Sequence, residues 1–186
     1  MTGEETTIGG VRVKLAGDDR RGVLAWELTS IDDGSIDGIL SIATDQPGPG
    51  RRQHPNGASR LDHVVMTTPD LQRTLGALLA FGFEPRRSRD VPGSDPARRQ
   101  VFCWAGEPII ELVGPVESTG TGPASIWGLA LTSDNMEQTV AVLGPAVSKP
   151  KPAVQPGRTI ATVDTTNLDI SVSLAVMSAH VKPPRL

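Results

Sequence analysis

Residues 61–79 read LDHVVMTTPDLQRTLGALL, and residues 126–144 read IWGLALTSDNMEQTVAVLG. The two stretches align at an offset of 65 residues, the separation of His63 and Gly128. In each, an alternating apolar run precedes a polar turn and then apolar residues at helical spacing, as in a strand followed by an amphipathic helix. Two diverged copies of one unit are the simplest explanation. Matching positions are Thr67 and Thr132, Leu71 and Met136, Thr74 and Thr139, Leu75 and Val140, and Leu78 and Leu143.

The copies differ at one pair of polar positions. His63 and Glu111 of the first copy correspond to Gly128 and Ser171 of the second. Histidine and glutamate are metal-ligand types, whereas glycine has no side chain and serine has only a neutral hydroxyl. A metal or ligand site built on these positions is therefore expected to have its charged side chains only from the first copy.

The first copy, residues 61–115, is predicted to fold as β-α-β-β-β. Its helix should begin at Pro69 and Asp70 and end at Gly82. The apolar helix positions, which recur at i, i+4, i+7 and i+8, are Leu71, Leu75, Leu78 and Leu79. The predicted strands are 61–68, 83–91, 99–105 and 108–113.

The second copy, residues 124–178, is predicted to have the same order. Its strands are expected at 125–132, 158–164 and 168–177, and its helix at 134–143. The remaining strand should lie between residues 146 and 154, where prolines predict a ragged edge or a loop. Residues 179–186 are expected to form a flexible tail.

The N-terminal part has a different pattern. Residues 11–44 alternate short apolar runs with turn residues, which predicts two or three antiparallel strands. Residues 1–44 are expected to join the sheet through these strands. Residues 45–60 are rich in Pro and Gly and are expected to form a linker or loop. His54 in this loop is expected to be solvated, and the alternative is a lid residue.

Composition narrows the class of partner. The net charge of −3, the absence of Tyr and the three Phe and three Trp residues argue against nucleic-acid binding. Cys103 is the single cysteine, which excludes an internal disulfide and is expected to be a buried thiol. No apolar run reaches membrane-spanning length, and the acidic N-terminus lacks a signal-peptide pattern. A cytoplasmic protein without a membrane partner is expected.

The alternation of side chains along a strand predicts which residues share a face. Val64 and Met66 lie on one face of the first strand, and His63 lies on the other. Ile110 and Leu112 likewise oppose Glu111. If the leucine-rich helix covers the more apolar face, His63 and Glu111 both lie on the opposite face, where a cleft is expected.

These features resemble the vicinal oxygen chelate superfamily, which includes glyoxalase I, extradiol dioxygenases and bleomycin-resistance proteins. The resemblance rests on the paired β-α-β-β-β units, on LDHVV in the first strand and on IIELVGP at 109–115. It implies an α+β fold whose paired modules form a cupped mixed sheet with helices on the outer face, plus extra N-terminal strands. Family members cup a divalent metal with ligands from both modules. His63 and Glu111 match the first module's ligand positions, and Gly128 and Ser171 do not match the second's.

Five residues are the candidate ligand-binding residues: His63, Gln100, Glu111, Trp127 and Arg158. His63 and Glu111 are also the candidate metal ligands, and Gln100, Asp169 or His54 could complete their set. Trp127 could stack on a flat ligand, and Arg158 could present its guanidinium to a carboxylate or phosphate. The alternatives are structural: a histidine near the core, a glutamate or arginine in an ion pair, and a core tryptophan.

Three functions fit this pattern, and the sequence does not decide whether the protein is an enzyme. The first is a small-molecule-binding protein without a cofactor, with a cleft on the concave sheet face. The second is a metal-dependent lyase, isomerase or dioxygenase that uses His63 and Glu111 with Zn, Ni, Fe or Mn. The third is a metal-free enzyme with one of these residues as general base. The ligand is expected to be a small molecule, and the resemblance also allows a homodimer.

Overall fold

The computed structural model describes residues 4–16, 19–46, 48, 50 and 54–180. It has an α+β fold with one mixed sheet of eight strands, in the hydrogen-bonded order β11-β12-β13-β10-β6-β9-β8-β7. Two small sheets have the orders β1-β2 and β3-β5-β4.

The elements before the first module are β1 (Glu5–Ile8), β2 (Val11–Lys14), β3 (Ala25–Leu28), β4 (Gly34–Ile36) and β5 (Ile39–Ala43). The first module contains β6 (Ala58–Thr67), α1 (Leu71–Ala80), β7 (Pro85–Val91), β8 (Arg98–Trp104) and β9 (Ile109–Pro115). The second contains β10 (Ser125–Ser133), α2 (Met136–Leu143), the 3-10 helix η1 (Gly144–Ala146), β11 (Lys151–Pro152), β12 (Thr159–Thr162) and β13 (Ser173–Ser178).

The predicted β-α-β-β-β order is therefore confirmed in both copies. In each module the first strand lies beside the last, β6 beside β9 and β10 beside β13. The chain divides into two compact units. We name them the α1 unit (residues 19–47 and 63–128) and the α2 unit (residues 1–18, 48–62 and 129–186) and describe each by itself.

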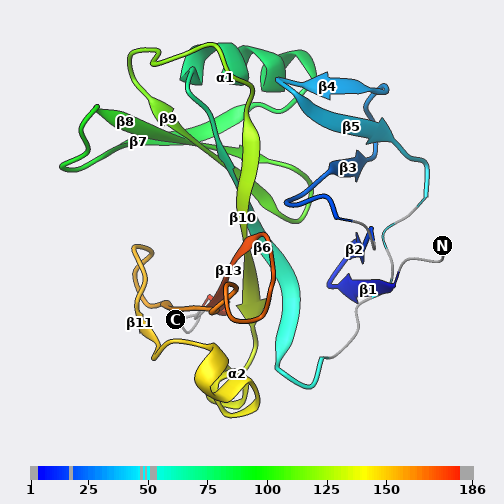
Figure 1. Ribbon diagram of the computed structural model, residues 1–186, viewed down its shortest axis with the longest axis vertical. Helices are drawn as coiled ribbons and strands as arrows, with labels where there is room; N and C mark the ends of the chain where they lie inside the picture. Colours follow the sequence, from blue (N-terminus) through cyan, green and yellow to red (C-terminus); the bar gives the residue numbers. More distant parts are fainter. Residues whose placement is uncertain (1–3, 17–18, 47, 49, 51–53, 181–186) are drawn as a thin grey trace, which may run out of the picture. The chain divides into compact units, whose positions relative to one another are not determined.

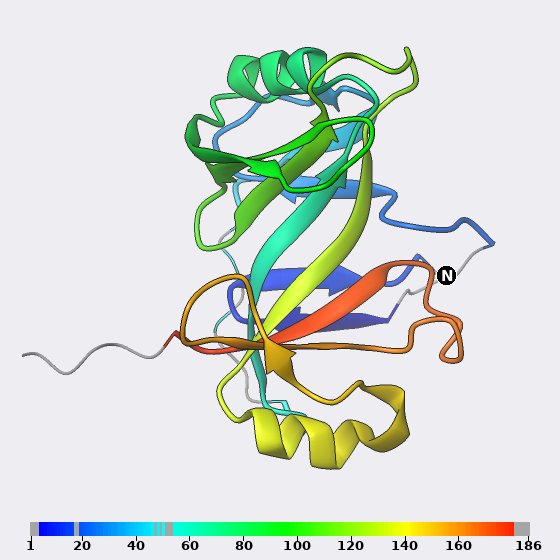
Figure 2. The same ribbon diagram turned by 90° about the vertical axis from the view of Figure 1, so that its left-hand side faces the viewer.

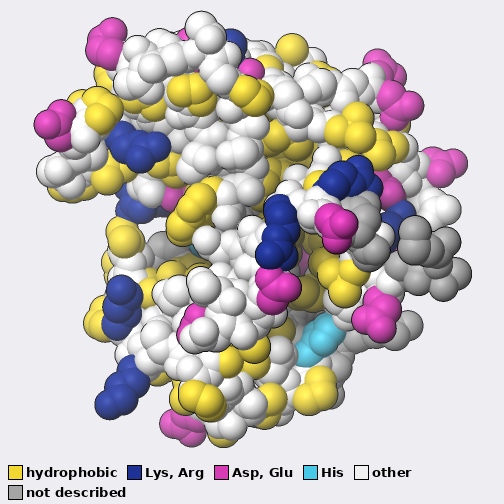
Figure 3. Space-filling view, viewed as in Figure 1, with side chains coloured by type: hydrophobic (Ala, Val, Ile, Leu, Met, Phe, Trp, Pro, Cys, Tyr) yellow, Lys and Arg dark blue, Asp and Glu magenta, His cyan; other side chains and the backbone are white. Residues whose placement is uncertain are grey.

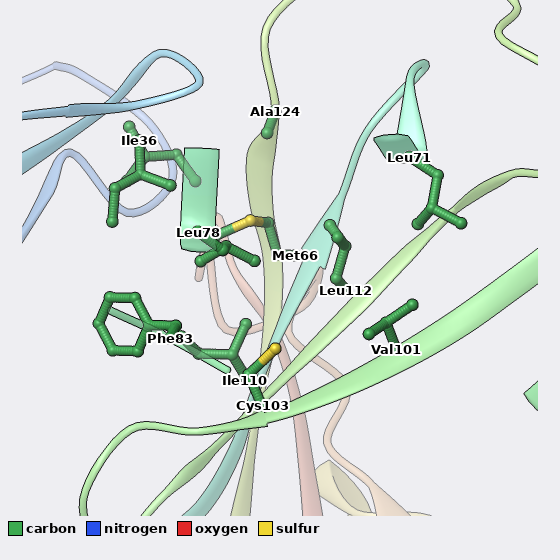
Figure 4. Close-up of a cluster of buried hydrophobic side chains, with 11 residues drawn as sticks. Ile36, Met66, Leu71, Leu78, Phe83, Val101, Cys103, Ile110, Leu112 and Ala124 are labelled. Atoms are coloured by element: carbon green, nitrogen blue, oxygen red, sulfur yellow. The ribbon is translucent and has the colours of Figure 1, made fainter. Parts of the chain in front are cut away.

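The core of the α1 unit lies under helix α1, which packs against β9 and β4 (Figure 1). Leu78 lies beside Met66 in this core, and Cys103 lies beside Ile110 (Figure 4). The buried members of the cluster are Ile36, Ile39, Met66, Leu71, Leu78, Phe83, Val101, Cys103, Ile110, Leu112 and Ala124. Met66 of β6 and Ile110 and Leu112 of β9 thus face the helix, as the alternation of side chains predicts.

The α2 unit has a smaller core, in which α2 packs against β13 (Figure 2). Its buried residues are Val147, Ala161, Val163 and Val176. Helix α2 contributes Met136, Val140 and Leu143, all of which remain partly exposed. The strand expected between residues 146 and 154 is reduced to β11 and one isolated bridge from Val147 to Val163, so the ragged edge is confirmed.

The two helices begin in the same way. Asp70 and Asn135 are N-caps with nearly equal backbone angles, φ −138° and ψ 96° against φ −141° and ψ 96°. Each side chain accepts a hydrogen bond from the backbone N–H three residues on, at 3.0 Å. A capping carboxylate or amide satisfies a backbone donor that the helix leaves unpaired. Because the caps lie 65 residues apart, they confirm the repeat at the offset read from the sequence.

In each module, a hydrogen bond between two buried side-chain hydroxyls links the helix to the end of the preceding strand. Thr74 Oγ1 lies 2.6 Å from Thr68 Oγ1, and Thr139 Oγ1 lies 2.7 Å from Ser133 Oγ. All four residues are buried. The sequence match of Thr74 with Thr139 is therefore a structural match, since the buried hydroxyls satisfy one another in both modules.

Three expectations about the elements need correction. The N-terminal segment forms five strands where two or three antiparallel ones were predicted, and β3 and β5 pair in parallel. Among the described residues, these strands form sheets of their own and do not join the main sheet. One edge of that sheet, β7, presents exposed arginines, and the other, β11, contains Pro152; charge and proline at an edge both disfavour further pairing. Strand β6 begins at Ala58, inside the segment expected to be a loop. Leu79 is 47% exposed and is not part of the helix's buried face.

The loop and tail expectations are only partly covered by the structure, because residues 47, 49, 51–53 and 181–186 lie outside the described residues. His54 is partly buried, and its Nε2 lies against the carbonyl oxygen of Thr7, so it is neither simply solvated nor a lid. No helix among the described residues is long and apolar enough to span a membrane. On the face seen in Figure 3, basic and acidic side chains are interspersed, and neither forms a continuous patch.

Candidate functional site

His63 and Glu111 lie together on the sheet face opposite α1. In the register of the parallel strands β6 and β9, Val65 is the partner of Glu111 and His63 is the partner of Ile109, so all four side chains share one face. His63 Nε2 lies 3.6 Å from Glu111 Oε2, and both side chains are largely buried. The predicted proximity of the two residues is confirmed.

Gln100 connects Glu111 to an arginine that the sequence reading had not singled out. Gln100 Nε2 donates to Glu111 Oε1 at 2.5 Å, and Gln100 Oε1 accepts from Arg89 Nε at 2.5 Å. Because arginine only donates, the amide oxygen must face Arg89 and the amide NH₂ must face the carboxylate. The orientation of the amide is therefore set by its two neighbours.

The result is a polar row across four adjacent strands. Arg89 lies on β7, Gln100 on β8, Glu111 on β9 and His63 on β6. Arg89 is the register partner of Gln100, and the other two contacts are diagonal ones between neighbouring strands, which long side chains can span. We call these four residues the polar row.

A second arginine and an aromatic residue border the polar row. Phe102 is the register partner of Glu111 on one side and of Arg87 on the other. The guanidinium carbon of Arg87 lies 4.7 Å from the Phe102 ring centroid, and that of Arg89 lies 5.5 Å away. Beside them is a pocket of about 170 Å³ whose lining includes Arg87, Phe102, Trp104 and Ile109.

Trp127 lies on the same face of the α1 unit. The neighbouring strands β6 and β10 are joined here by the hydroxyls of Thr67 and Ser125, which lie 3.2 Å apart. Trp127 is two residues beyond Ser125 and therefore shares its face, as His63 shares that of Thr67. Its side chain is 59% exposed, so it is not a core tryptophan.

A larger hollow opens at the far end of this face. It has a volume of about 450 Å³ and is lined by Thr67, Thr68, Pro69, Pro96, Arg98, Pro115, Thr119, Pro123 and Ser125. Thr67 lies four residues beyond His63 on β6, which is roughly 13 Å along a strand. Arg98, which also lines the hollow, is two residues from Gln100 on β8, so the hollow lies next to the Gln100 end of the polar row.

Arg158 belongs to a different environment. It is 3% exposed and lies in the α2 unit, where its Nη2 is 2.6 Å from Asp62 Oδ2. Its other donors reach Gln155 Oε1 at 2.6 Å and the carbonyl oxygen of Ser178 at 2.7 Å. The structural alternative, an arginine paired with an acidic residue, therefore describes Arg158 better than a ligand-facing guanidinium does.

The same ion pair lies beside buried residues of the second module's first strand. Ala130 and Thr132 are both fully buried. Thr132 Oγ1 donates to Asp62 Oδ2 at 2.8 Å, beside Arg158. Ser171 precedes β13, which begins at Ser173, and is exposed. The second module therefore presents no counterpart to the polar row.

The donor set can be tested against the divalent metal that the resemblance implies. The described residues contain no group of three or more His, Cys, Asp or Glu side chains that could hold a metal ion. His63 and Glu111 are two donors, and a tight site usually has at least three. Gln100 does not complete them, because its only oxygen is bonded to the cationic Arg89. The residues present do not fit a tightly bound divalent metal.

Solved structures with a similar architecture support this view of the fold. A methylmalonyl-CoA epimerase from Mycobacterium tuberculosis superposes with a TM-score of 0.53 at 14% identity, over 70% of this chain and 94% of that one. A second methylmalonyl-CoA epimerase gives 0.50 at 15% identity, over 65% and 95%. A hypothetical protein from Bacillus halodurans C-125 gives 0.51 at 18% identity, over 68% and 98%. This is the vicinal oxygen chelate fold.

The vicinal oxygen chelate fold thus accounts for the paired modules, and the predicted resemblance is confirmed at the level of structure. No family model and no curated protein matches the sequence. At identities of 14–18%, the similarity defines the fold, and the site must be argued from its own residues.

The buried cysteine gives a first testable prediction. Cys103 is 1% exposed in the core of the α1 unit, and burial raises the pKa of its thiol. Because the thiolate is the reactive form, a disulfide reagent should modify the native protein only as fast as the core opens. The reagent's coloured thiol product, measured by absorbance, should appear slowly at pH 8 and immediately in denaturant. Immediate stoichiometric reaction of the native protein would show that Cys103 is accessible.

Proposed function

We propose that this protein is a metal-independent small-molecule-binding protein, with its ligand site on the sheet face opposite α1. The observation that carries the proposal is the polar row of Arg89, Gln100, Glu111 and His63. Placing a carboxylate, an imidazole and an amide in a largely buried setting costs desolvation energy. An apolar sheet face would be more stable, so residues that break the apolar pattern in this way are candidates for function.

Two further features support a small ligand at this place. Phe102 and Ile109, the register partners of Glu111 and His63, line the pocket of about 170 Å³, so that pocket borders the polar row. Apolar walls with a few convergent polar groups are the usual setting for small-molecule binding. The solved structures of the same fold include enzymes named for methylmalonyl-CoA, which favours a small-molecule ligand class without assigning that substrate to this chain.

The second candidate function is metal-dependent lyase, isomerase or dioxygenase chemistry. The separation of 3.6 Å between His63 Nε2 and Glu111 Oε2 favours it, because both atoms could reach one Zn, Ni, Fe or Mn ion. The engaged oxygen of Gln100 weighs against it. We therefore rank this candidate below the metal-independent one.

Metal content separates the two candidates. Protein expressed without added metal and dialysed against metal-free buffer should contain well under one equivalent of any transition metal, because two protein ligands hold such ions weakly. Inductively coupled plasma mass spectrometry gives the content directly. A stoichiometric metal that survives dialysis and disappears in Glu111→Gln would favour the metal-dependent candidate.

Ligand screening tests the proposed site. Small molecules that bind the dialysed protein in ligand-observed NMR should lose at least about tenfold in affinity in Glu111→Gln or His63→Ala, since each change removes a charged or polar partner. Gln72→Ala, an exposed change on α1, is the control and should bind as the wild type does. Ligands that bind all variants equally would place the site elsewhere and refute the proposal.

A further inference from the structure

Two arginine side chains share one aromatic ring at the edge of the main sheet. Arg87 and Arg89 are alternate residues of β7 and therefore lie on one face. Their guanidinium carbons lie 4.7 Å and 5.5 Å from the centroid of Phe102, within the range of cation–π attraction. Both cations therefore lie against the same aromatic ring.

Most N–H groups of these two arginines make no hydrogen bond to the described residues. Within the described part of the chain, neither Arg87 nor Arg89 has a carboxylate partner. Arg89 donates only its Nε–H, to Gln100. Two other arginines of the α1 unit do have carboxylate partners: Arg99 pairs with Asp90 at 2.7 Å, and Arg73 with Asp37 at 2.8 Å. The guanidinium N–H groups over Phe102 are therefore available to a ligand.

The charge of this arrangement points to an anion. Two guanidinium cations over one ring repel each other, and the repulsion is stronger beside a partly buried aromatic side chain than in bulk water. An anion between them would relieve the repulsion and accept hydrogen bonds from both forks. Arginine suits a planar anion in particular, because its donors match the two oxygens of a carboxylate.

The lining of the neighbouring pocket indicates what the rest of the ligand should be. The pocket of about 170 Å³ is lined by Arg86 and Arg87 and by the apolar groups of Phe102, Cys103, Trp104 and Ile109. Arg89 lies outside this lining, against the ring of Phe102. An apolar cavity of about 150 Å³ is large enough to bind benzene in another protein, so there is room here for one six-membered ring. Trp104 is half exposed and forms an accessible wall.

We propose that this pocket binds a small aromatic carboxylate. The ring packs on Phe102, Trp104 and Ile109, and the carboxylate pairs with Arg87 and Arg89. The inference deepens the proposed function, since it rests on the same sheet face and names the chemical class of its ligand. It places the apolar end of the ligand beside Ile109, the register partner of His63, and so brings the ligand to the edge of the polar row.

Calorimetric titration of the full-length protein tests the inference with two probes of equal shape. Phenylacetate should bind, and the neutral phenylacetamide should bind at least about tenfold more weakly, because it cannot form the charge-assisted pairs. Arg87→Gln should weaken phenylacetate binding at least about tenfold and leave the affinity for phenylacetamide unchanged. Raising the salt concentration should reduce the difference between the two probes.

A matched control removes the same charge from the same hairpin. Arg99 lies on β8 with its side chain on the opposite face, where it pairs with Asp90. Arg99→Gln should therefore bind phenylacetate as the wild type does. Phe102→Leu provides a second variant: it keeps an apolar floor but removes the aromatic face that orders the arginines, and it should also weaken phenylacetate binding.

Several outcomes would overturn the inference. Equal binding of phenylacetate and phenylacetamide, equal losses in Arg87→Gln and Arg99→Gln, or no binding of phenylacetate by the wild type would each do so. Preferential binding of phenyl phosphate would refute the carboxylate assignment. If other small molecules still bind in a manner sensitive to Glu111→Gln, the proposed function stands and only the ligand class is wrong.

Discussion

Arg158→Met should lower the free energy of unfolding by about 3–5 kcal/mol, the largest effect expected from a single substitution in this chain. The guanidinium makes a two-pronged pair with Asp62, at 2.6 Å and 3.3 Å, and both side chains are almost completely buried. Methionine fills similar space but removes the guanidinium charge and the two donors that Arg158 gives to the Asp62 carboxylate. Removing the charged partner of a buried carboxylate is far more costly than the intact pair was favourable.

A double variant distinguishes this cause from a general packing defect. Asp62→Leu combined with Arg158→Met removes both charges and should recover most of the stability that the single variant loses. Urea unfolding followed by circular dichroism measures the midpoints, and an unchanged dependence on urea shows that the comparison is valid. A double variant less stable than Arg158→Met alone would contradict the buried-pair explanation.

The exposed pair of Arg99 and Asp90 is the matched control. Their side chains are 40% and 70% exposed, and solvent screens such pairs strongly. The hydrogen bond from Arg99 lowers the pKa of Asp90. The contribution of the pair to the free energy of unfolding is therefore present above the ordinary pKa of aspartate and is lost as the pH falls. Arg99→Met should shift the urea midpoint far less than Arg158→Met does.

Much of the fold was predictable because the repeat carries local information. The helix caps Asp70 and Asn135 and the buried hydroxyls of Thr74 and Thr139 depend on residues close in sequence, and they recur at the same offset. Strand alternation placed His63 and Glu111 on one face, since the side-chain period of a strand is independent of its partners. These features of the fold can be predicted without knowledge of long-range packing.

The remainder of the site depends on long-range register. Arg89 meets Gln100, and Arg87 meets Phe102, only because β7 and β8 pair in one register, which a bulge near Pro85 also affects. In the sequence, these arginines belong to the run RRSR at residues 86–89, which does not by itself indicate what they contact. A search for arginines that share strand parity with a candidate glutamate would have found Arg89, but only after the pairing was known.

Arg158 was misplaced for a related reason. Its partner Asp62 is 96 residues away, and nothing local to either residue encodes the pair. The adjacent Gly157 has a positive φ of 75°, and Arg158 after it is buried in the interior and does not face a ligand site. Ser171 was assigned to the last strand by its apolar neighbours, and the turn around Asp169, with φ 52°, delays that strand to Ser173.

Leu78→Ala should lower the free energy of unfolding by about 2–5 kcal/mol, because it opens a cavity beneath helix α1. Leu78 has no exposed surface and lies beside Met66 in the core (Figure 4). The loss should be at the upper end of this range if the surrounding side chains cannot move to fill the space, and at the lower end if they can. Urea unfolding gives the value, and near-ultraviolet circular dichroism shows whether the native packing survives.

The next residue of the same helix supplies the sharpest control. Leu79→Ala makes the same chemical change one position along, where the side chain is 47% exposed, and should cost less than about 1 kcal/mol because little apolar area is lost and alanine favours the helix. Gln72→Ala, also exposed, should stay within about 0.5 kcal/mol of the wild type. Equal losses at Leu78 and Leu79 would mean that α1 does not pack on β9 as described. The assignment of His63 and Glu111 to the face away from the helix would then lose its support, because it depends on which face α1 covers.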